Sequence, residues 1–262
     1  MEGEVAFGVE PGRRAPYELR QARYHRLAEV VAKEIARVNR EYRRPAKLLD
    51  IGVHTGRTLR YLEPHLERAP FKGDAVALTG VDLFPLGKDR VYRRDDWKLV
   101  DGDLEDGLPD LPSPEYDVVV CEQVLEHLHE YAPLLKDIER IVAPGGAVII
   151  GVPIFPLGLH RLRPWLIRAS DQLWGFRERS HVQAWSLRTL LGDLQRLSTL
   201  EPIDVRGFRI VSGGALRFLE FRRWWWRFNR WVGRQVPGLC VEVQIVLRKR
   251  GGPEASSHRL QY

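Results

Sequence analysis

Residues 48 to 56 read Leu48-Leu49-Asp50-Ile51-Gly52-Val53-His54-Thr55-Gly56, an apolar run that leads into a turn with two glycines. The run resembles a buried strand, and helical spacing follows at 58–66. Ligands of open α/β sheets bind where such strands end. Two nucleotide loops are excluded, because a dinucleotide turn needs glycine where His54 and Arg57 stand, and no Gly-Lys-Ser/Thr follows for a P-loop.

An alternation of strands and helices extends from this turn. Apolar runs typical of buried strands occupy 47–51, 77–83, 97–100, 116–121 and 147–152, and helical segments include 58–66 and 134–142. The spacing at 17–42 predicts a further amphipathic helix, and two last strands are predicted at 208–211 and 240–248. Strands that alternate with helices predict an α/β fold with a parallel sheet.

Length and composition favour one domain. The chain has 262 residues, and its two cysteines, Cys121 and Cys240, form no metal-binding or disulfide pattern. Neither a membrane-spanning run nor a secretion signal is visible, so we expect a cytoplasmic protein. We expect a flexible arm at 1–16, a single domain at 17–250 and a disordered tail at 251–262.

Further stretches follow the glycine turn in a fixed order. They are Thr79-Gly80-Val81-Asp82-Leu83, Asp101-Gly102-Asp103-Leu104, the segment 116–128 and Ala143-Pro144-Gly145-Gly146. Together with Asp50-x-Gly52-x-x-x-Gly56, this order resembles class I S-adenosylmethionine-dependent methyltransferases, among them the ubiquinone-pathway O-methyltransferases. The resemblance covers about 45–250 by position. It implies a Rossmann-like fold with a seven-stranded, mostly parallel sheet, an antiparallel last strand and helical cap insertions at 153–185 and 212–238.

The resemblance implies S-adenosylmethionine as the cofactor. Asp82 would accept both ribose hydroxyls, and Asp103 would lie beside the adenine amino group. His54 stands where many relatives have glycine. A domain that keeps the fold without turnover is the alternative to an enzyme. The implied cofactor-binding residues are Asp50, Gly52, His54, Gly56, Asp82, Leu83, Asp103, Leu104, Glu122 and Gln123.

Two histidines are candidates for the base that deprotonates an oxygen acceptor. They are His181, in a His-x-x-x-aromatic-Ser segment similar to the family's, and His127, which follows the fourth strand. Some relatives hold a divalent metal with Glu-x-x-Glu-His at that place. Here Gln123 replaces the first carboxylate, and because an amide is a poorer, neutral ligand, we expect no metal. The alternative is a metal site formed by Glu126, His127 and His181.

Two segments combine tryptophan with arginine, at 157–176 and 216–234, and residues 205–234 carry eight Arg against one acid. In the second segment, aromatic residues such as Trp224 and Trp231 share one helical face, arginines share the other, and Trp226 lies off the apolar face. The helix either meets an anionic membrane surface or packs on its own domain. We expect a small apolar, lipid-like, quinone-like or glycan-lipid acceptor, with 2′-O methylation of RNA as the alternative.

Overall fold

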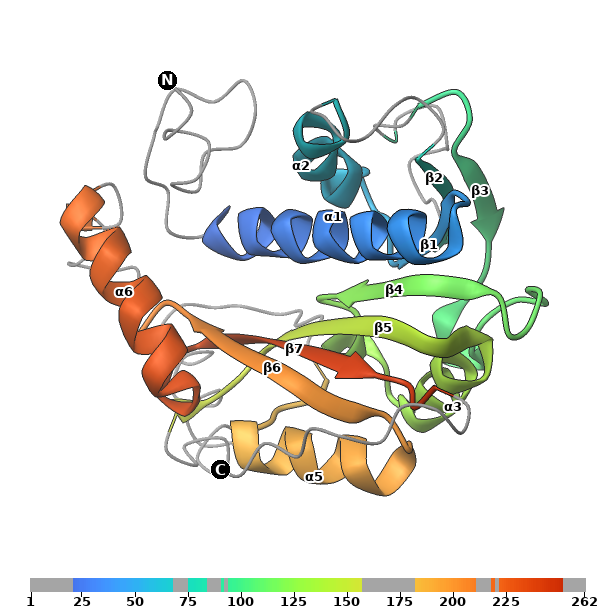
Figure 1. Cartoon of the computed structure of the whole chain (residues 1–262). Coiled ribbons are helices and arrows are strands. Elements are labelled where there is room, and N and C mark those ends of the chain that lie inside the picture. Colours follow the sequence, from blue (N-terminus) through green and yellow to red (C-terminus); the bar gives the residue numbers. More distant parts are fainter. Residues whose placement is uncertain are drawn as a thin grey trace.

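A single mixed sheet organises the structure, a computed structural model that describes residues 21–67, 75–83, 91, 94–156, 182–210, 218–219 and 222–251. Across these ranges the strand order is β3-β2-β1-β4-β5-β7-β6 (Figure 1). The two pairings of β7 are antiparallel, because β7 runs against both β5 and β6, while the other neighbouring strands are parallel. This confirms the expected sheet with its antiparallel last strand. The strands are β1 (Ala46–Ile51), β2 (Val76–Asp82), β3 (Lys98–Asp101), β4 (Tyr116–Glu122), β5 (Val142–Pro153), β6 (Glu201–Phe208) and β7 (Glu242–Arg248).

Helices cover both faces of the sheet (Figure 1). On one face, α1 (Ala22–Tyr42) and α2 (Arg57–Leu66) pack on one core cluster, and on the other, α3 (Ala132–Ile141) and α5 (Leu187–Leu197) pack on a second. Strand β4 lies between the two clusters and is buried along its whole length, as expected for a central parallel strand. The last helix, α6 (Arg223–Gln235), lies against β6 at the edge of the sheet.

The penultimate strand lies earlier in the sequence than predicted. We expected a strand at 208–211, whereas β6 ends at Phe208. The sequence of β6 hides the strand, because among the described strands it lies at the edge, pairs only with β7, and carries Pro202, Asp204 and Arg206. Charged residues and proline are tolerated at a sheet edge, where one side of the backbone needs no partner. An apolar pattern therefore could not locate it.

Helix α5 was also not predicted, although its start follows a local rule. The Ser186 hydroxyl accepts the Thr189 N–H, and the Thr189 hydroxyl accepts the Ser186 N–H. This reciprocal capping satisfies backbone donors that the first turn leaves without partners. Its buried residues, Leu190 and Leu194, pack into the core cluster below the sheet.

Helix α6 packs with a face opposite to the one that the sequence favoured. Trp226, which looked surplus to packing, is 6% exposed and clusters with Phe208 and Ala22. Trp224 and Trp231, by contrast, are each 60% exposed. The prediction that Trp226 lies outside the packed face is therefore wrong. Hydrophobicity alone ranks these tryptophans equally, so it could not identify the one that meets β6.

Several predictions fall on residues outside the described ranges. They concern the arm at 1–16, the first basic segment at 157–176, His181, and the tail from 252 onward. Where the chain is described, no helix combines the length and the apolar character that crossing a membrane requires.

Candidate functional site

Four strand ends meet at one edge of the sheet and bring the predicted cofactor residues together. The strands β3, β2, β1 and β4 are neighbours and parallel, so their carboxyl ends lie side by side. In the register, Ile51 pairs with Val81 and with Cys121, and Asp82 pairs with Asp101. Asp50, Asp82 and Glu122 lie in the last residues of β1, β2 and β4, and the other seven predicted cofactor-binding residues lie in the loops that follow the four strands.

The glycine turn after β1 needs its glycines for two physical reasons. Gly52 and Gly56 have φ angles of 75° and 73°, a left-handed conformation that glycine adopts without steric cost. A Cβ atom on Gly52 would also overlap the side chain of Val124 in the loop after β4. The two loops therefore approach each other more closely than any larger residue would permit.

His54 adopts the left-handed conformation as well, with a φ of 49°. It stands where glycine is expected from the resemblance, and the backbone conformation explains that expectation, since a side chain is disfavoured there. Its N–H donates to Oδ2 of Asp82 at 2.6 Å, which fixes the turn against β2.

Asp82 connects two loops and keeps acceptor capacity. Its Oδ2 accepts the His54 N–H, and its Oδ1 accepts the Leu83 N–H at 2.7 Å. A carboxylate offers about four acceptor positions, so each oxygen retains one for a ligand. The orientation of this carboxylate is therefore set by the backbone before any hydroxyl binds.

Asp103 follows β3 and begins a single 3₁₀ turn, Leu104–Asp106. Its Oδ1 accepts the Glu105 N–H at 3.0 Å, and the residue is exposed. Leu104 is half-buried and packs against the core cluster on the α3 side. Asp103 and Leu104 thus place an acid and an apolar side chain next to each other, close to the end of β2.

Asp50 is a buried acid directly beneath the glycine turn. It is 2% exposed, and burial raises its pKa to about 7, with a hydrogen bond from Thr58 opposing the shift and Glu122 and Asp82 adding to it. Its Oδ2 is buried without a hydrogen-bond partner. An orphaned buried oxygen is the observation expected where a cofactor's donor groups complete the site, so these residues fit S-adenosylmethionine.

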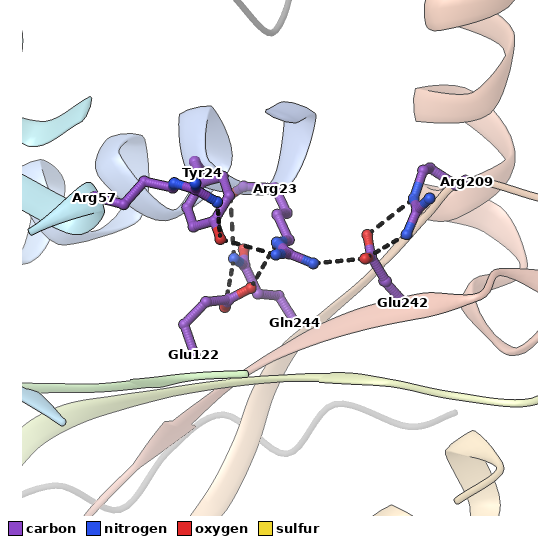
Figure 2. Close-up of polar contacts among 7 residues, drawn as sticks. All are labelled: Arg23, Tyr24, Arg57, Glu122, Arg209, Glu242 and Gln244. Atoms are coloured by element: carbon purple, nitrogen blue, oxygen red, sulfur yellow. Dashed lines mark hydrogen bonds and ion pairs between the residues drawn. The ribbon is translucent and has the colours of Figure 1, made fainter. Parts of the chain in front are cut away.

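Glu122, at the end of β4, belongs to a buried ion-pair network. Figure 2 shows Arg23 of α1 between Glu122 and Glu242, with Gln244 beside Glu122. Arg23 Nε lies 3.3 Å from Glu122, and Arg23 Nη1 donates to Glu242 at 2.5 Å. Gln244 Nε2 donates to Glu122 at 3.0 Å. Burial raises the pKa of Glu122 to about 7, although the charge of Arg23 opposes the shift.

The same network reaches the glycine turn through Tyr24. The Tyr24 hydroxyl accepts from Arg23 at 2.8 Å and from Arg57, the first residue of α2, at 3.2 Å (Figure 2). Arg23, Glu242 and Gln244 were not among the predicted site residues. They come from the first helix and the last strand, so no local pattern could connect them.

Gln123 takes a strained conformation in the loop after β4, with a φ of 59°. Its N–H donates to the Gly151 carbonyl at 2.7 Å, while its Nε2 is buried without a hydrogen-bond partner. A positive φ in a residue other than glycine is uncommon and often occurs at functional sites. The side-chain amide nitrogen is therefore a buried donor that the protein itself leaves without an acceptor.

Glu126 lies in a buried environment that the sequence did not predict. It is fully buried, and neither carboxyl oxygen has a hydrogen-bond partner in another residue. Burial raises its pKa to about 8, so the carboxyl group is mainly protonated at neutral pH. Its backbone carbonyl accepts N–H groups from Val182 and Gln183, at 2.7 and 3.1 Å, which ties that segment to the loop.

Of the two candidate bases, His127 lies in the described part of the chain. His127 ends the short 3₁₀ turn Leu125–His127 and is half-buried, and its N–H donates to Val124 at 2.9 Å. His181 lies outside the described residues. In the part of the chain that the structure describes, no group of three or more His, Cys, Asp or Glu is arranged to hold a metal ion.

Comparisons with known proteins agree with this geometry. A family model described as a methyltransferase domain matches residues 22–197. Malonyl-[acyl-carrier protein] O-methyltransferase of Halorhodospira halophila is 28% identical over 167 residues, which cover 61% of this chain and 53% of that protein. The match thus spans about half the length of that relative.

Solved structures share the fold at low sequence identity. A geranyl diphosphate methyltransferase in complex with SAM aligns with a TM-score of 0.57 and 14% identity, over 93% of this chain and 94% of that one. An S-adenosylmethionine-dependent methyltransferase from Mesorhizobium loti aligns with a TM-score of 0.50 and 14% identity, over 79% and 92% of the two chains. With the family match across the strand ends described above, the chain belongs to the methyltransferase domain family.

Proposed function

We propose that the chain methylates an oxygen atom of a small apolar acceptor of lipid-like, quinone-like or glycan-lipid chemistry. The observation that carries the cofactor half of this proposal is the Asp82 carboxylate, which two backbone N–H groups orient beside the glycine turn. S-adenosylmethionine, when bound, supplies a methyl group on a sulfonium centre. We assign its binding to Asp50, Gly52, His54, Gly56, Asp82, Leu83, Asp103, Leu104, Glu122 and Gln123.

Two observations support oxygen as the methylated atom. The Halorhodospira halophila relative is an O-methyltransferase by name, which favours the same chemistry here. Glu126 adds a buried carboxyl group, mainly protonated at neutral pH, without a hydrogen-bond partner in another residue. Such a group can donate a hydrogen bond to an acceptor oxygen and so orient it.

We assign the base that removes the acceptor proton to His181, with His127 as the second candidate. If an imidazole takes this proton, turnover of the His181→Ala variant should fall at least about a hundredfold, a typical contribution of general base catalysis. Steady-state assays with the acceptor that the enzyme methylates would measure this turnover. His127→Ala is the matched comparison, and unchanged turnover of His181→Ala would exclude His181 from the chemistry.

The acceptor class is tested directly by a labelling experiment. The purified chain is incubated with methyl-labelled S-adenosylmethionine and, separately, with hydroquinones, fatty acids, glycolipids and single-stranded RNA. We expect label in an apolar product, with a methyl ether or ester identified by mass spectrometry. Label in RNA, with binding that weakens steeply as salt is raised, would instead support the RNA alternative, because phosphate contacts release counterions.

A further inference from the structure

A basic cavity lies away from the methyl-transfer site, between α1, β6 and α6. Its volume is about 500 Å³, and its lining includes six cationic side chains against one acid, Glu29. None of the loops that follow β1, β2, β3 or β4 contributes to it. The cationic residues are Arg26, Lys33, Arg206, Arg227, Arg230 and Arg234.

The acids near the cavity are too few to balance its charge. Asp204 pairs with Arg26 at 2.9 Å and with Arg206 at 3.0 Å, and Glu29 lies 3.6 Å from Arg26. With Arg227 left aside and Asp204 included, two carboxylates face the other five cations in the described residues. A cluster of like charges is unfavourable unless an anion enters it.

Arg230 is the cation that most needs a partner. It is half-buried beneath the ring of Trp226, at 4.9 Å from the ring centroid, and its Nη1 is buried without a hydrogen-bond partner. Burial lowers its pKa; Glu29 partly offsets this, and Arg26, Arg234 and Arg206 lower it further. A guanidinium donor without a partner, inside a basic cavity, is suited to a phosphate oxygen.

Beside the cavity, α6 exposes an aromatic surface. Trp224 and Trp231 are each 60% exposed and Phe228 is 44% exposed, and their rings form a chain of contacts through Trp225. Trp231 also lines the cavity, so the rings and the cations are adjacent. The sequence from 222 to 241 contains no acid. Tryptophan rings beside arginines are typical of elements that lie in the headgroup region of a membrane.

We propose that α6 docks the enzyme on an anionic membrane surface, with its aromatic rings among the lipid headgroups and a phospholipid phosphate in the basic cavity. The adjacency of Trp231 to both features favours a lipid over an acidic protein, because a phospholipid offers an apolar region and a phosphate a few ångströms apart. This docking is separate from methyl transfer and needs neither cofactor nor acceptor.

Vesicle sedimentation without S-adenosylmethionine tests the docking. We compare vesicles of phosphatidylcholine alone with vesicles that contain about three parts in ten of phosphatidylglycerol. We expect the protein to sediment with the anionic vesicles at low salt and to be released at high salt, with a blue shift of tryptophan emission on binding. Equal sedimentation with both vesicle types, or with neither, would overturn the proposal.

Variants locate the contact. The double change Arg230→Gln and Arg234→Gln should weaken binding to anionic vesicles roughly tenfold to thirtyfold. The pair Arg40→Gln and Arg196→Gln removes the same charge from α1 and α5 and should have much less effect. Because Arg230 is half-buried, Trp224→Ala with Trp231→Ala is a second variant, made at exposed positions, and it should abolish the blue shift. Equal weakening by the control pair would show nonspecific charge attraction and contradict the cavity.

A soluble anion distinguishes the source of the phosphate. Inorganic phosphate at the same phosphate concentration should neither shift the tryptophan emission nor compete effectively with the vesicles. If inorganic phosphate stabilises the protein against heat while the protein does not bind to vesicles, the cavity holds a free anion and the membrane proposal is wrong.

Discussion

Asp82 holds two backbone segments together, and in our proposal it also binds the cofactor. Its two oxygens hold the glycine turn and the end of β2 together, and each keeps one acceptor position for a sugar hydroxyl. We therefore expect Asp82→Ala to lower S-adenosylmethionine affinity between severalfold and about a hundredfold, because charge-assisted hydrogen bonds are lost. Isothermal titration calorimetry would measure this.

The control for Asp82→Ala is Asp110→Ala, which removes one negative charge from an exposed position in the acidic stretch after β3. It should leave affinity nearly unchanged. Thermal unfolding should show that both variants remain folded. Wild-type affinity of Asp82→Ala would contradict the assignment of this residue to the cofactor.

Glu126 makes stability depend on pH in an unusual direction. Its folded pKa is raised to about 8, above the ordinary value of 4.5, so between these values the folded state binds more protons than the unfolded state. Stability should therefore fall as pH rises through that window, by at most about 1.4 kcal/mol per pH unit for one group. The Glu126→Gln variant should show a flatter profile.

Urea unfolding of the apo protein between pH 5 and pH 9 would measure the effect of Glu126. Glu130→Gln is the matched control, because Glu130 is exposed and lies four residues away. If Glu126→Gln and the wild type lose the same free energy of unfolding over this range, the carboxyl group is not protonated in the folded protein.

The strand-end positions of the proposed cofactor residues were predictable from the sequence because their constraints are local. The glycine turn needs Gly52 and Gly56 for left-handed backbone, and Asp82 and Asp103 follow strands whose ends must meet in a parallel sheet. Glu126 gave no comparable signal. Its burial depends on how the β4 loop meets the segment at Val182 and Gln183, which lies more than fifty residues further along the chain.

Helix α6 illustrates the limit of a periodicity argument. Its position is set by a backbone contact, because a Cβ atom on Gly233 would overlap the Gly207 carbonyl of β6. Asn229 also fixes the helix, since its Oδ1 accepts the Ile210 N–H at 2.8 Å. A small residue and a buried amide therefore define the packed face. The aromatic stripe, which the helical periodicity of the sequence picks out first, does not define the packed face.

Alanine substitutions at two helical glycines should change the stability of the protein in opposite directions. Gly233→Ala should destabilise the protein by about 1–3 kcal/mol, because α6 must move away from β6 to accommodate the methyl group. Gly192→Ala, on the exposed side of α5 with open space around it, should stabilise by about 1 kcal/mol through helix propensity. Chemical denaturation would measure both. Similar effects of the two changes would mean that α6 does not contact β6 at Gly207.

The first helix and the last strand are joined by ion pairs across more than two hundred residues. Glu34 of α1 accepts two hydrogen bonds from Arg248 of β7, at 2.7 and 2.8 Å, and a third from Arg37 at 2.9 Å. Arg37 and Arg248 also donate to the carbonyl of Gly145, which lies in β5. The network therefore links both ends of the described chain to the centre of the sheet.

This connection predicts coupling between Glu34 and Arg248 in a double-mutant cycle. With Glu34→Gln and Arg248→Met, the interaction energy should be about 1–3 kcal/mol, because the pair is bidentate and largely buried. Glu41→Gln, which removes an exposed partner of Arg37, should cost less than about 0.5 kcal/mol. A coupling near zero would mean that α1 is held by apolar packing alone.

The stability that Glu34 contributes depends on pH with the opposite sign to the stability that Glu126 contributes. Burial alone would raise the pKa of Glu34, but Arg248 and then Arg37 outweigh it and hold the pKa below 4.5. The folded state therefore binds fewer protons than the unfolded state near that value. The contribution of Glu34 is present above pH 4.5 and is lost as pH falls through its folded pKa. Acid unfolding of Glu34→Gln should consequently show a shallower loss of stability than the wild type, and identical acid profiles would indicate that Glu34 carries no charge in the folded protein.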